Sequence, residues 1–386
     1  MKKVVINKKA AKTLREFFPW IYRSDIIDHQ KFEAGELVKI VDEEGKSLGI
    51  GYINLNSVIS IRVLDFKIQN VDKDFFIKRI KDALQQRVDI YSNAFRVIHS
   101  EADMLPGLIV DRYDEYLSLQ INTAGMLRYK DIILEALVEV LRPKGVVIDA
   151  DRYSLQKEGV EVFEPKIVGK VPNNIIFEEN GIKFSVDITS GQKTGFYLDQ
   201  RRNREIVSRY IKQKSKVLDL FCNIGGFGLY AAKKADADVE LVDISKEAIE
   251  KAKNNFKLNN VEGKFVCENV FDYLRVLRAG VKKYDMIIID PPSFAKNKNQ
   301  KKGALRGFKD LMVNALKIAD NQGYIAIFSC SYYVYEEDLV QIALKASKDT
   351  KKRLKIVEVL YQDIDHPYVV NIPTSKYLKG FLFKVL

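Results

Sequence analysis

Cysteine is scarce in this chain, and long apolar runs are missing. Only three of the 386 residues are cysteines, Cys222, Cys267 and Cys330, and no pair has CxxC spacing. Neither a disulfide framework nor a zinc site is therefore predicted, and no metal is expected. No apolar stretch approaches the ~18 residues that a membrane span needs, and residues 1–9 lack the apolar core of a signal peptide. We expect a cytoplasmic protein.

The charge is mixed in sign but not balanced. The chain has 63 Lys and Arg against 52 Asp and Glu, a formal net charge of +11. Residues 186–386 contain 35 basic and 24 acidic residues, so this part of the chain accounts for the whole excess. A basic excess suits a polyanionic partner such as nucleic acid, although surface lysine also serves solubility.

The length predicts two or three domains. Residues 1–72 have short strand patterns separated by Gly and Asn turns, at residues 36–41, 48–53 and 57–64. Such regular spacing predicts a small β-barrel, with a helix over residues 10–18 before Pro19. Residues 73–186 mix helix and strand patterns, beginning with a helix expected over residues 74–91, and form a predicted α+β module.

Residues 187–386 repeat a strand followed by a helix. Strands are predicted at residues 216–221, 239–242, 264–267, 286–289, 323–328 and 355–361, with helices such as 246–258 and 307–319 between them. This alternation predicts an α/β domain whose parallel sheet is covered on both faces. In such sheets a ligand binds beyond the carboxyl ends of the strands, near the switch in strand order.

Three of these strand ends have residues suited to a nucleoside ligand. The first strand runs into Asp219-Leu-Phe-Cys-Asn-Ile-Gly-Gly-Phe-Gly-Leu229, an acidic residue followed by glycines that open a helix. Glycines allow close backbone approach, and a helix N-terminus offers free N–H donors. Asp243 ends the second strand and can accept both hydroxyls of a ribose. Asn269, after the third strand, is placed to reach an adenine edge.

The next two strand ends have residues suited to catalysis. Asp290 stands at the open end of the fourth strand, and the two prolines that follow it stiffen the loop. Cys330 follows the fifth strand, at the mouth of the same crevice, which favours a nucleophile over a small packing residue. Cys222 and Cys267 are interpreted as packing residues.

The order of these motifs resembles that of a class I S-adenosylmethionine-dependent methyltransferase. The matching residues are Asp219-x-Phe-x-x-x-Gly-Gly-Phe227, Asp243, Asp290-Pro-Pro-x-Phe294 and Ser329-Cys-Ser331. More narrowly, the chain resembles the PUA-domain-containing family of large-subunit ribosomal RNA cytosine-5 methyltransferases. Further similarities lie in Gln192-Lys-Thr-Gly-Phe-Tyr-Leu-Asp-Gln-Arg201, Asp365-His-Pro367 and Tyr377-Leu-Lys-Gly380, and the resemblance covers essentially the whole chain.

The resemblance implies a fold and a set of site residues. A Rossmann-like methyltransferase domain over residues 187–386 would follow a PUA-like RNA-binding barrel over residues 1–72 and the α+β module. S-adenosyl-L-methionine would be the cofactor. Its binding residues would be Asp219, Gly225, Phe227, Asp243, Asn269, Phe196, Asp199 and Gln200. The family often has Asp where Asn269 stands, so one adenine contact differs.

The resemblance also implies a reaction at carbon 5 of cytosine. Cys330 would be the nucleophile that adds to carbon 6, and Asp290 would hold the N3/N4 edge of the base. A neighbouring family has a second cysteine in the loop after the fourth strand, where this chain has Ser293, so release of the product by a second cysteine is not expected. The base that removes the carbon 5 proton is not identified.

A target base has to enter this crevice, accessible or flipped out of its strand. A lysine-rich segment after Asp290 is predicted to be a loop that contacts RNA phosphates, through Lys296, Lys298, Lys301, Lys302 and Arg306. Tyr332, Tyr333 and Tyr335 suit base stacking or core packing equally well. The expected partner is large-subunit ribosomal RNA. The oligomeric state is left open, with a homodimer as one alternative.

Three other functions share parts of this pattern. A guanine-nitrogen RNA methyltransferase uses similar Asp-Pro-Pro motifs, and Cys330 would then be incidental. A non-catalytic RNA-binding protein on the same fold is the second alternative, although each expected cofactor position has a usable residue. A nicotinamide dehydrogenase is disfavoured because Gly-Gly-Phe-Gly departs from the Gly-x-Gly-x-x-Gly pattern.

Overall fold

The computed structural model describes residues 1–27, 30–189, 196–295 and 297–386. The chain divides into two compact units, each built from segments that are distant in sequence. The first comprises Met1–Phe177, Val186–Leu198 and Ile364–Lys376, and the second comprises Glu178–Ser185, Asp199–Asp363 and Tyr377–Leu386. The two units are built from six segments, whereas the sequence predicts three continuous domains, residues 1–72, 73–186 and 187–386. Those domain boundaries stay a prediction.

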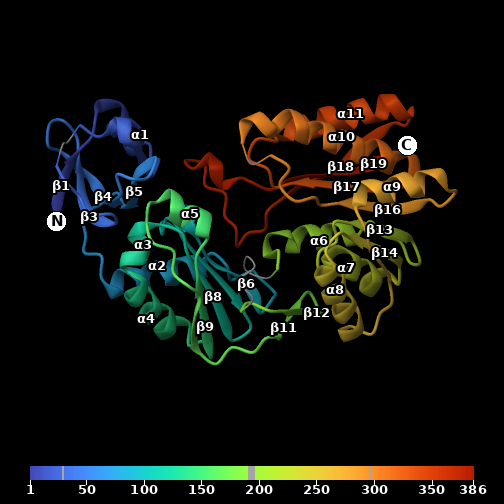
Figure 1. The fold of residues 1–386 in the computed structure, drawn as a ribbon, viewed down its shortest axis with the longest axis horizontal. Coiled ribbons are helices and arrows are strands. Elements are labelled where there is room, and N and C mark those ends of the chain that lie inside the picture. The colour runs from blue at the N-terminus through green and yellow to red at the C-terminus, as the bar shows by residue number, and fades with distance from the viewer. Residues whose placement is uncertain (28–29, 190–195, 296) are drawn as a thin grey trace. The chain divides into compact units, whose positions relative to one another are not determined.

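The first unit contains two five-stranded sheets, with strand orders β1-β3-β4-β5-β2 and β10-β9-β8-β7-β6 (Figure 1). The first sheet is formed by β1 (Lys2–Val5), β2 (Trp20–Tyr22), β3 (Glu36–Val41), β4 (Ser47–Ile53) and β5 (Ile59–Asp65), with helix α1 (Lys8–Arg15). The second is formed by β6 (Ala94–His99), β7 (Leu108–Tyr113), β8 (Tyr116–Ile121), β9 (Gly145–Asp149) and β10 (Lys166–Gly169). Its helices are α2 (Lys73–Gln85), α3 (Ala124–Arg128), α4 (Lys130–Leu141) and α5 (Arg152–Lys157). Strands β11 (Ile175–Glu179) and β12 (Ile182–Val186) then pair with each other.

Helix α2 ends at Gln85, earlier than the expected position 91, because of a long-range ion pair. The Arg87 guanidinium is buried and forms a salt bridge of 2.6 Å with Asp103. It also donates to the carbonyl of Ala83, which a continuing helix would use for its own backbone bond. Val88, which lies beyond the observed end of the helix, is 74% exposed.

The second unit is a seven-stranded sheet of order β15-β14-β13-β16-β17-β19-β18. The strands are β13 (Lys216–Leu220), β14 (Asp238–Asp243), β15 (Lys264–Cys267), β16 (Tyr284–Ile289), β17 (Ala319–Ser329), β18 (Leu354–Tyr361) and β19 (Lys379–Val385). The first five are parallel to one another, and β19 is antiparallel to both of its neighbours. The predicted α/β fold with a largely parallel sheet is confirmed.

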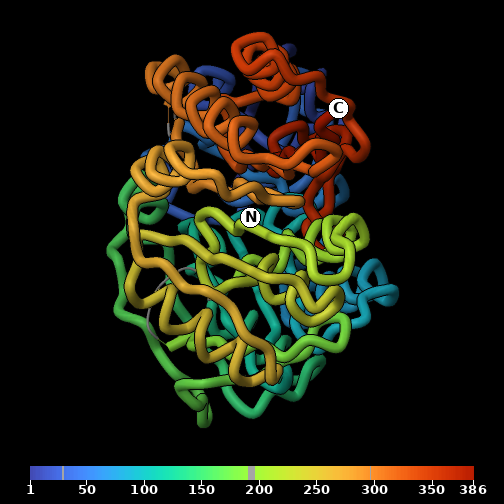
Figure 2. Tube along the Cα trace, turned by 90° about the vertical axis from the view of Figure 1, so that its right-hand side faces the viewer, coloured from blue at the N-terminus to red at the C-terminus, as the bar shows by residue number. Residues whose placement is uncertain are grey.

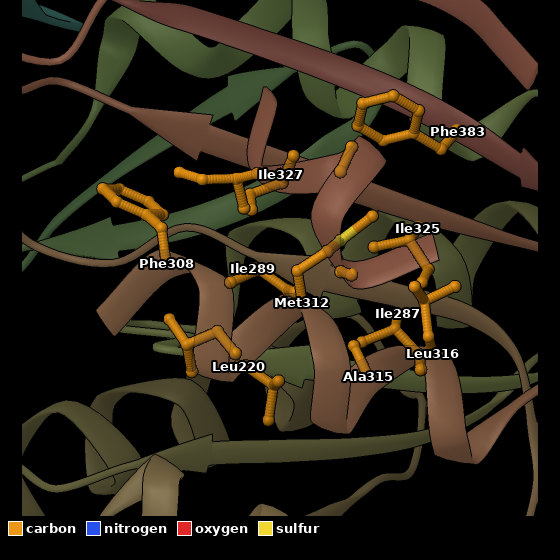
Figure 3. Packing of buried hydrophobic residues seen from close by; sticks show 14 of the residues in the cluster. Leu220, Ile287, Ile289, Phe308, Met312, Ala315, Leu316, Ile325, Ile327 and Phe383 are labelled. Carbon is orange, nitrogen blue, oxygen red and sulfur yellow. The ribbon is translucent and has the colours of Figure 1, made fainter. Parts of the chain in front are cut away.

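Helices cover both faces of this sheet, as Figures 1 and 2 show. They are α6 (Arg201–Ser208), α7 (Gly226–Ala235), α8 (Lys246–Leu258), α9 (Val270–Ala279), α10 (Lys301–Ile318) and α11 (Glu336–Thr350). Figure 3 shows Phe308, Met312 and Leu316 of α10 packed against side chains of β13, β16 and β17. Burial of such side chains supplies the main stabilisation of a two-sided sheet.

One buried carboxylate ties three strands and a helix together. Glu240 of β14 is 1% exposed, and its oxygens lie 2.9 Å from Lys264 Nζ and 2.6 Å from Lys282 Nζ. The hydroxyls of Tyr273 and Tyr284 also donate to it. Although burial alone would raise the pKa of Glu240, the hydrogen bonds from Lys282, Tyr273 and Lys264 outweigh burial and lower it to about 2.

We predict that Glu240→Gln lowers the free energy of unfolding by roughly 1–3 kcal/mol at pH 7, because it removes the charge that these four donors share. The folded-state pKa lies below the unfolded one, so this stabilisation is present above about pH 4.5 and is lost as the pH falls toward 2. Urea unfolding at pH 7 and pH 3 should show a smaller difference between variant and wild type at pH 3.

The matched control for this prediction is Glu247→Gln, which removes an exposed carboxylate paired with Lys251 on α8. Exposed pairs contribute little, so its effect should stay below about 0.5 kcal/mol. Equal effects of the two substitutions at pH 7 would contradict the structural role assigned to Glu240.

Among the described residues, no helix combines the length and hydropathy required of a membrane span.

Candidate active site

The strand order changes direction at β13, which pairs with β14 on one side and with β16 on the other. The carboxyl ends of these three parallel strands therefore meet at one edge of the sheet, where open α/β sheets bind their ligands. Asp219 precedes the last residue of β13, Asp243 ends β14, and Asp290 follows β16. The structure thus brings three of the predicted site residues to the same edge.

The glycine turn between β13 and α7 has an unusual backbone. Phe221 and Asn223 have φ angles of 60° and 48°, and Gly225 follows with 82°. The positive φ at Gly225 favours glycine, and a Cβ there would lie 3.1 Å from the Leu241 side chain, which would have to shift slightly. The backbone N–H of Asn223 donates to Asp243 Oδ2 over 2.9 Å, which joins the turn to the end of β14.

Asp219 is buried beneath this turn. It is 1% exposed, and its Oδ2 accepts a hydrogen bond of 2.8 Å from the backbone N–H of Gly228. Burial, with the nearby charges of Asp290 and Asp243, raises the pKa of Asp219 to about 7. The carboxyl group of Asp219 is therefore partly protonated at pH 7.

Asp290 is held by a buried amide from the residue that precedes helix α6. Gln200 Nε2 donates to Asp290 Oδ2 over 2.9 Å, and Gln200 Oε1 accepts from Asn203 Nδ2 over 2.6 Å. Burial, with the charge of Asp199, raises the pKa of Asp290 to about 7. Gln200 is thus bonded to the predicted base-binding carboxyl group, and its expected contact with the cofactor stays a prediction.

Asp199 lies beside these groups and has one oxygen in use. Its Oδ2 accepts a hydrogen bond of 2.7 Å from the Tyr377 hydroxyl. Its Oδ1 is buried and has no hydrogen-bond partner in the described structure. A buried carboxylate oxygen without a donor is costly, so this atom is suited to accept a hydrogen bond from a ligand.

A buried ion pair that the sequence did not suggest lies close to these acids. Arg204 Nε and NH2 each lie 2.7 Å from an oxygen of Glu179, and both side chains are almost fully buried. The positive charge of Arg204 acts to lower the pKa of Asp219 and of Asp290, against the effect of burial. In the sequence, Arg204 stands out only because it lies three residues after Arg201, the last residue of the segment 192–201 that resembles the family.

Asn269 serves first as the N-terminal cap of α9. Its Oδ1 accepts hydrogen bonds from the backbone N–H groups of Phe271 at 2.9 Å and Asp272 at 3.4 Å. Its amide oxygen therefore stabilises the helix, while its NH₂ group can donate to a ring nitrogen of a base. Contact between Asn269 and an adenine stays a prediction.

The three cysteines have different surroundings. Cys222 is buried, and burial raises the pKa of its thiol well above the ordinary value, which disfavours the thiolate. Cys267 is exposed, so its interpretation as a packing residue was wrong: it ends the sheet's edge strand, where little covers it. Cys330 is exposed directly after β17.

The loops after β16 and β17 are bonded to each other. Ser293 Oγ lies 3.0 Å from Ser331 Oγ, and the backbone N–H of Ala295 donates to the same Ser331 oxygen over 3.4 Å. Ser331 is 1% exposed and follows Cys330 directly. The loop that begins at Asp290 and the loop that contains Cys330 therefore form one connected structure.

The predicted basic loop is largely helical. Helix α10 begins at Lys301, six residues before the expected position, so Lys301, Lys302 and Arg306 lie on its first turns. Lys301 forms a salt bridge of 2.7 Å with Asp338, whereas Lys302 and Arg306 are exposed one helical turn apart. Lys298 lies in the short 3₁₀ turn before α10, and Lys296 lies outside the described residues.

Phe196 groups with the first unit. It is 8% exposed, and its ring packs against Phe177 with centroids 5.2 Å apart. Residues 192–195, which begin the segment 192–201 that resembles the family, lie outside the described residues. A cofactor contact by Phe196 stays a prediction.

Comparison with known proteins identifies the families of two regions of the chain. Residues 4–66 match the PUA-like domain family, and residues 167–318 match the S-adenosylmethionine-dependent methyltransferase family. The chain is 38% identical to the ribosomal RNA large subunit methyltransferase I of Tolumonas auensis over 99% of each chain. It is also 38% identical to the protein of the same name from Shewanella frigidimarina, over 97% of each chain.

The chain belongs to the ribosomal RNA large subunit methyltransferase I family. The structure is similar over its full length to SMU.776, a proposed methyltransferase in complex with SAH, with a TM-score of 0.85 and 23% identity. At that identity the likeness supports the fold alone. The predicted PUA-like domain and Rossmann-like class I methyltransferase fold are confirmed.

The methyltransferase uses S-adenosyl-L-methionine as its cofactor, and the edge of the sheet fits this molecule. Asp243 has both oxygens bonded to backbone N–H groups, those of Asn223 and Ser245, and each oxygen can accept one more donor such as a ribose hydroxyl. Oδ1 of Asp199, which has no partner among the described residues, adds a second acceptor. The positive φ at Gly225 allows a close backbone approach.

We predict that Asp290→Asn changes how the stability of this methyltransferase depends on pH. The folded-state pKa of about 7 lies above the unfolded value, so the wild-type carboxyl group destabilises the fold increasingly as the pH rises through 7. From pH 6 to pH 8 the free energy of unfolding of Asp290→Asn should gain about 1.4 kcal/mol relative to wild type. Chemical denaturation at the two pH values measures this gain.

Asp272→Asn is the control, since Asp272 is an exposed carboxylate in the first turn of α9. Its difference from wild type should be the same at pH 6 and pH 8. A pH-independent difference for Asp290→Asn as well would show that Asp290 ionises like an ordinary surface acid.

Proposed function

We propose that this protein methylates carbon 5 of a cytosine in large-subunit ribosomal RNA, through a covalent adduct between Cys330 and carbon 6. The observation that carries the proposal is the pair of loops joined by Ser293 and Ser331, since one begins with Asp290 and the other contains Cys330. A carboxyl group and an exposed thiol at the same edge of the sheet are the two groups that this chemistry requires. The names of the similar proteins support large-subunit ribosomal RNA as the substrate, and we propose that the reaction takes place in the cytoplasm.

Cytosine carbon 5 is a weak nucleophile until a group adds to the neighbouring carbon 6. The Cys330 thiolate forms a bond to carbon 6, and the electron pair of the C5=C6 double bond is freed for carbon 5. This pair forms the new bond to the methyl group, and the pair of the broken methyl–sulfur bond would stay on the sulfur of the demethylated cofactor. Loss of the carbon 5 proton to a base then returns an electron pair to the ring. The C5=C6 bond then re-forms as the C6–S bond breaks and its pair returns to sulfur.

Asp290 can act on the N3/N4 edge of the base. With a pKa raised to about 7 it is partly protonated at neutral pH, so it can donate a proton to N3 as carbon 6 is attacked. That proton returns to Asp290 when the double bond re-forms. The hydrogen bond from Gln200 Nε2 to Oδ2 leaves Oδ1 for the base and sets the orientation of the carboxyl group.

S-adenosyl-L-methionine supplies an electrophilic methyl group when it is bound. Asp243 would bind the ribose hydroxyls, and Asp199 would accept from the ligand through Oδ1, the oxygen without a partner in the described part of the chain. Asp219 orients the glycine turn through the N–H of Gly228, while Phe227 packs against Phe328 with ring centroids 5.2 Å apart. The last contact places the turn against the strand that leads to Cys330.

RNA would be held by exposed basic and aromatic side chains near the two loops. Lys298, Lys302 and Arg306 are exposed before and along the first turns of α10, and this segment follows the Asp290 loop directly. Tyr332 and Tyr335 are 53% and 51% exposed after Cys330, whereas Tyr333 packs against the apolar core. Exposed tyrosines are suited to stack on unpaired bases.

We predict that Cys330→Ala abolishes methyl transfer while the affinity for S-adenosyl-L-methionine stays within about twofold, since the thiol acts on the base and not on the cofactor. Methyl incorporation into ribosomal RNA and calorimetric titration with the cofactor measure the two quantities. Cys267→Ala, which removes the other exposed thiol, should keep both. Undiminished turnover by Cys330→Ala would refute the proposed nucleophile.

RNA that contains 5-fluorocytosine tests the same step directly. Fluorine at carbon 5 cannot leave as a proton does, so the wild-type enzyme should remain covalently bound to the RNA, and Cys330→Ala should not. Methylation of RNA without a trapped adduct would favour the guanine-nitrogen alternative. Failure to bind the cofactor at all would favour a non-catalytic RNA-binding protein.

We predict that the double substitution Lys302→Gln and Arg306→Gln weakens RNA binding and lowers its salt dependence. Each phosphate contact that is lost reduces the slope of log affinity against log salt by about 0.7–0.9. Titrations of ribosomal RNA at several salt concentrations measure the slope. Lys253→Gln with Lys257→Gln removes the same charge from exposed positions on α8 and should leave the slope unchanged.

A further inference from the structure

Strand β19 has a lysine where the surrounding residues are apolar. Lys379 is 6% exposed and lies opposite Ser329, the last residue of β17, in the antiparallel register. Its ammonium group donates to the carbonyl of Ser331 over 2.8 Å and to the carbonyl of Val334 over 2.9 Å. Both carbonyls belong to the loop that begins with Cys330.

Burial of this ammonium group is costly and calls for an explanation. A methionine or leucine would fill the same space without the desolvation penalty that a charged amine has to overcome. The turn already has its own backbone bond, from the N–H of Val334 to the carbonyl of Ser331 over 3.2 Å. The two hydrogen bonds that Lys379 donates are therefore not needed to close the turn.

The neighbouring glycine restricts where this lysine can lie. A Cβ at Gly380 would lie 2.5 Å from the ring of Phe328, so β19 approaches β17 closely at this point. The ring of Phe328 in turn packs against Phe227 in the first turn of α7. Lys379 is thus held at a set position relative to the end of β17 and to the residue that follows it, Cys330.

We infer that Lys379 is a positioning residue for Cys330: it fixes the loop through two carbonyls and places a positive charge that favours the thiolate. The inference rests on the proposed function and explains how a thiol there would be activated, since a nearby cation stabilises a thiolate relative to the thiol. This gives a physical role to residues 377–380, which the sequence marks only by their resemblance to the family.

Other titratable groups surround the loop, and the three carboxylates among them oppose this effect. Carboxylates would disfavour a thiolate, and the cation at the start of α10 is already paired with one of them over 2.7 Å. These groups are Asp290 after β16, Glu336 and Asp338 at the start of α11, Lys301 of α10, Tyr361 of β18, and Tyr332, Tyr333 and Tyr335 of the loop. Lys379 is the cation that bonds to the loop backbone itself.

The test is the pH dependence of alkylation of Cys330 by iodoacetamide in the full-length protein. Cys267→Ser removes the other exposed thiol, and Cys222 is buried. In this background Lys379→Met should raise the apparent pKa of Cys330 and slow its alkylation at pH 7 about tenfold, because an opposite charge typically shifts a pKa by at least one unit. Lys384→Met, on the same strand but opposite Tyr324, should alkylate like the parent.

A second variant separates charge from loop geometry. Lys379→Gln keeps N–H donors for the two carbonyls but has no charge, whereas Lys379→Arg keeps the charge. The inference expects slowed alkylation at pH 7 for Gln and near-parental alkylation for Arg. Parental pH profiles for both Met and Gln, in proteins whose cofactor affinity shows them to be folded, would overturn it.

Methyl transfer supplies an independent readout. The turnover of Lys379→Met should fall most at low pH and approach that of wild type as the pH rises, because the thiolate then forms without help from the lysine. Alkylation does not depend on catalysis, so the two proposals can fail separately. One outcome is that Cys330→Ala still methylates RNA while Lys379→Met shifts the titration of the Cys330 thiol. In that case Cys330 is not the nucleophile, but the role of Lys379 in lowering the pKa of the thiol stands.

Discussion

The pairing of β13 with β14 on one side and β16 on the other is the constraint on which the site depends. These parallel ladders align the strands so that their carboxyl ends meet at one edge of the sheet. A shift of one residue in either ladder would turn the site carboxylates toward the opposite face. The apolar residues of the same strands prevent this shift, because Leu220, Ile287 and Ile289 are buried against α10.

Electrostatics at this edge follow from burial. Asp219 is buried, Asp290 is half-buried, and both are close to other acids, so their pKa values rise to about 7. The bidentate pair of Arg204 and Glu179 places a cation nearby whose charge is largely neutralised by its partner. Raised carboxyl pKa values lower stability at neutral pH, and such groups are typical of sites where a proton has to be transferred.

The last strand of the chain contacts both sides of the candidate site. Tyr377 precedes β19 and donates to Asp199, Lys379 donates to the loop that contains Cys330, and Gly380 allows the close approach to Phe328. Since β19 is inserted between β17 and β18, residues at the C-terminus reach groups more than 40 positions earlier in the chain. The short segment from Tyr377 to Gly380 therefore links the part of the site assigned to the cofactor with the part assigned to the thiol.

The sequence by itself determined the strand ends and the residue types that occupy them. Alternating strand and helix patterns are local, so the positions of Asp219, Asp243, Asp290 and Cys330 could be predicted from neighbours along the chain. Helix caps such as Asn269 are local too, although its use of the amide oxygen for α9 became clear only from the hydrogen bonds.

Tertiary structure decided what depends on contacts between distant residues. Helix α2 stops early because Arg87 pairs with Asp103, and α10 starts early because its first turn packs beside α11, where Lys301 meets Asp338. Cys267 is exposed because β15 is an edge strand. Arg204, Gln200 and Lys379 acquire their roles through partners 25 to 90 positions away. Such partners cannot be identified from local pattern, because desolvation and hydrogen bonding depend on which surfaces the completed sheet brings together.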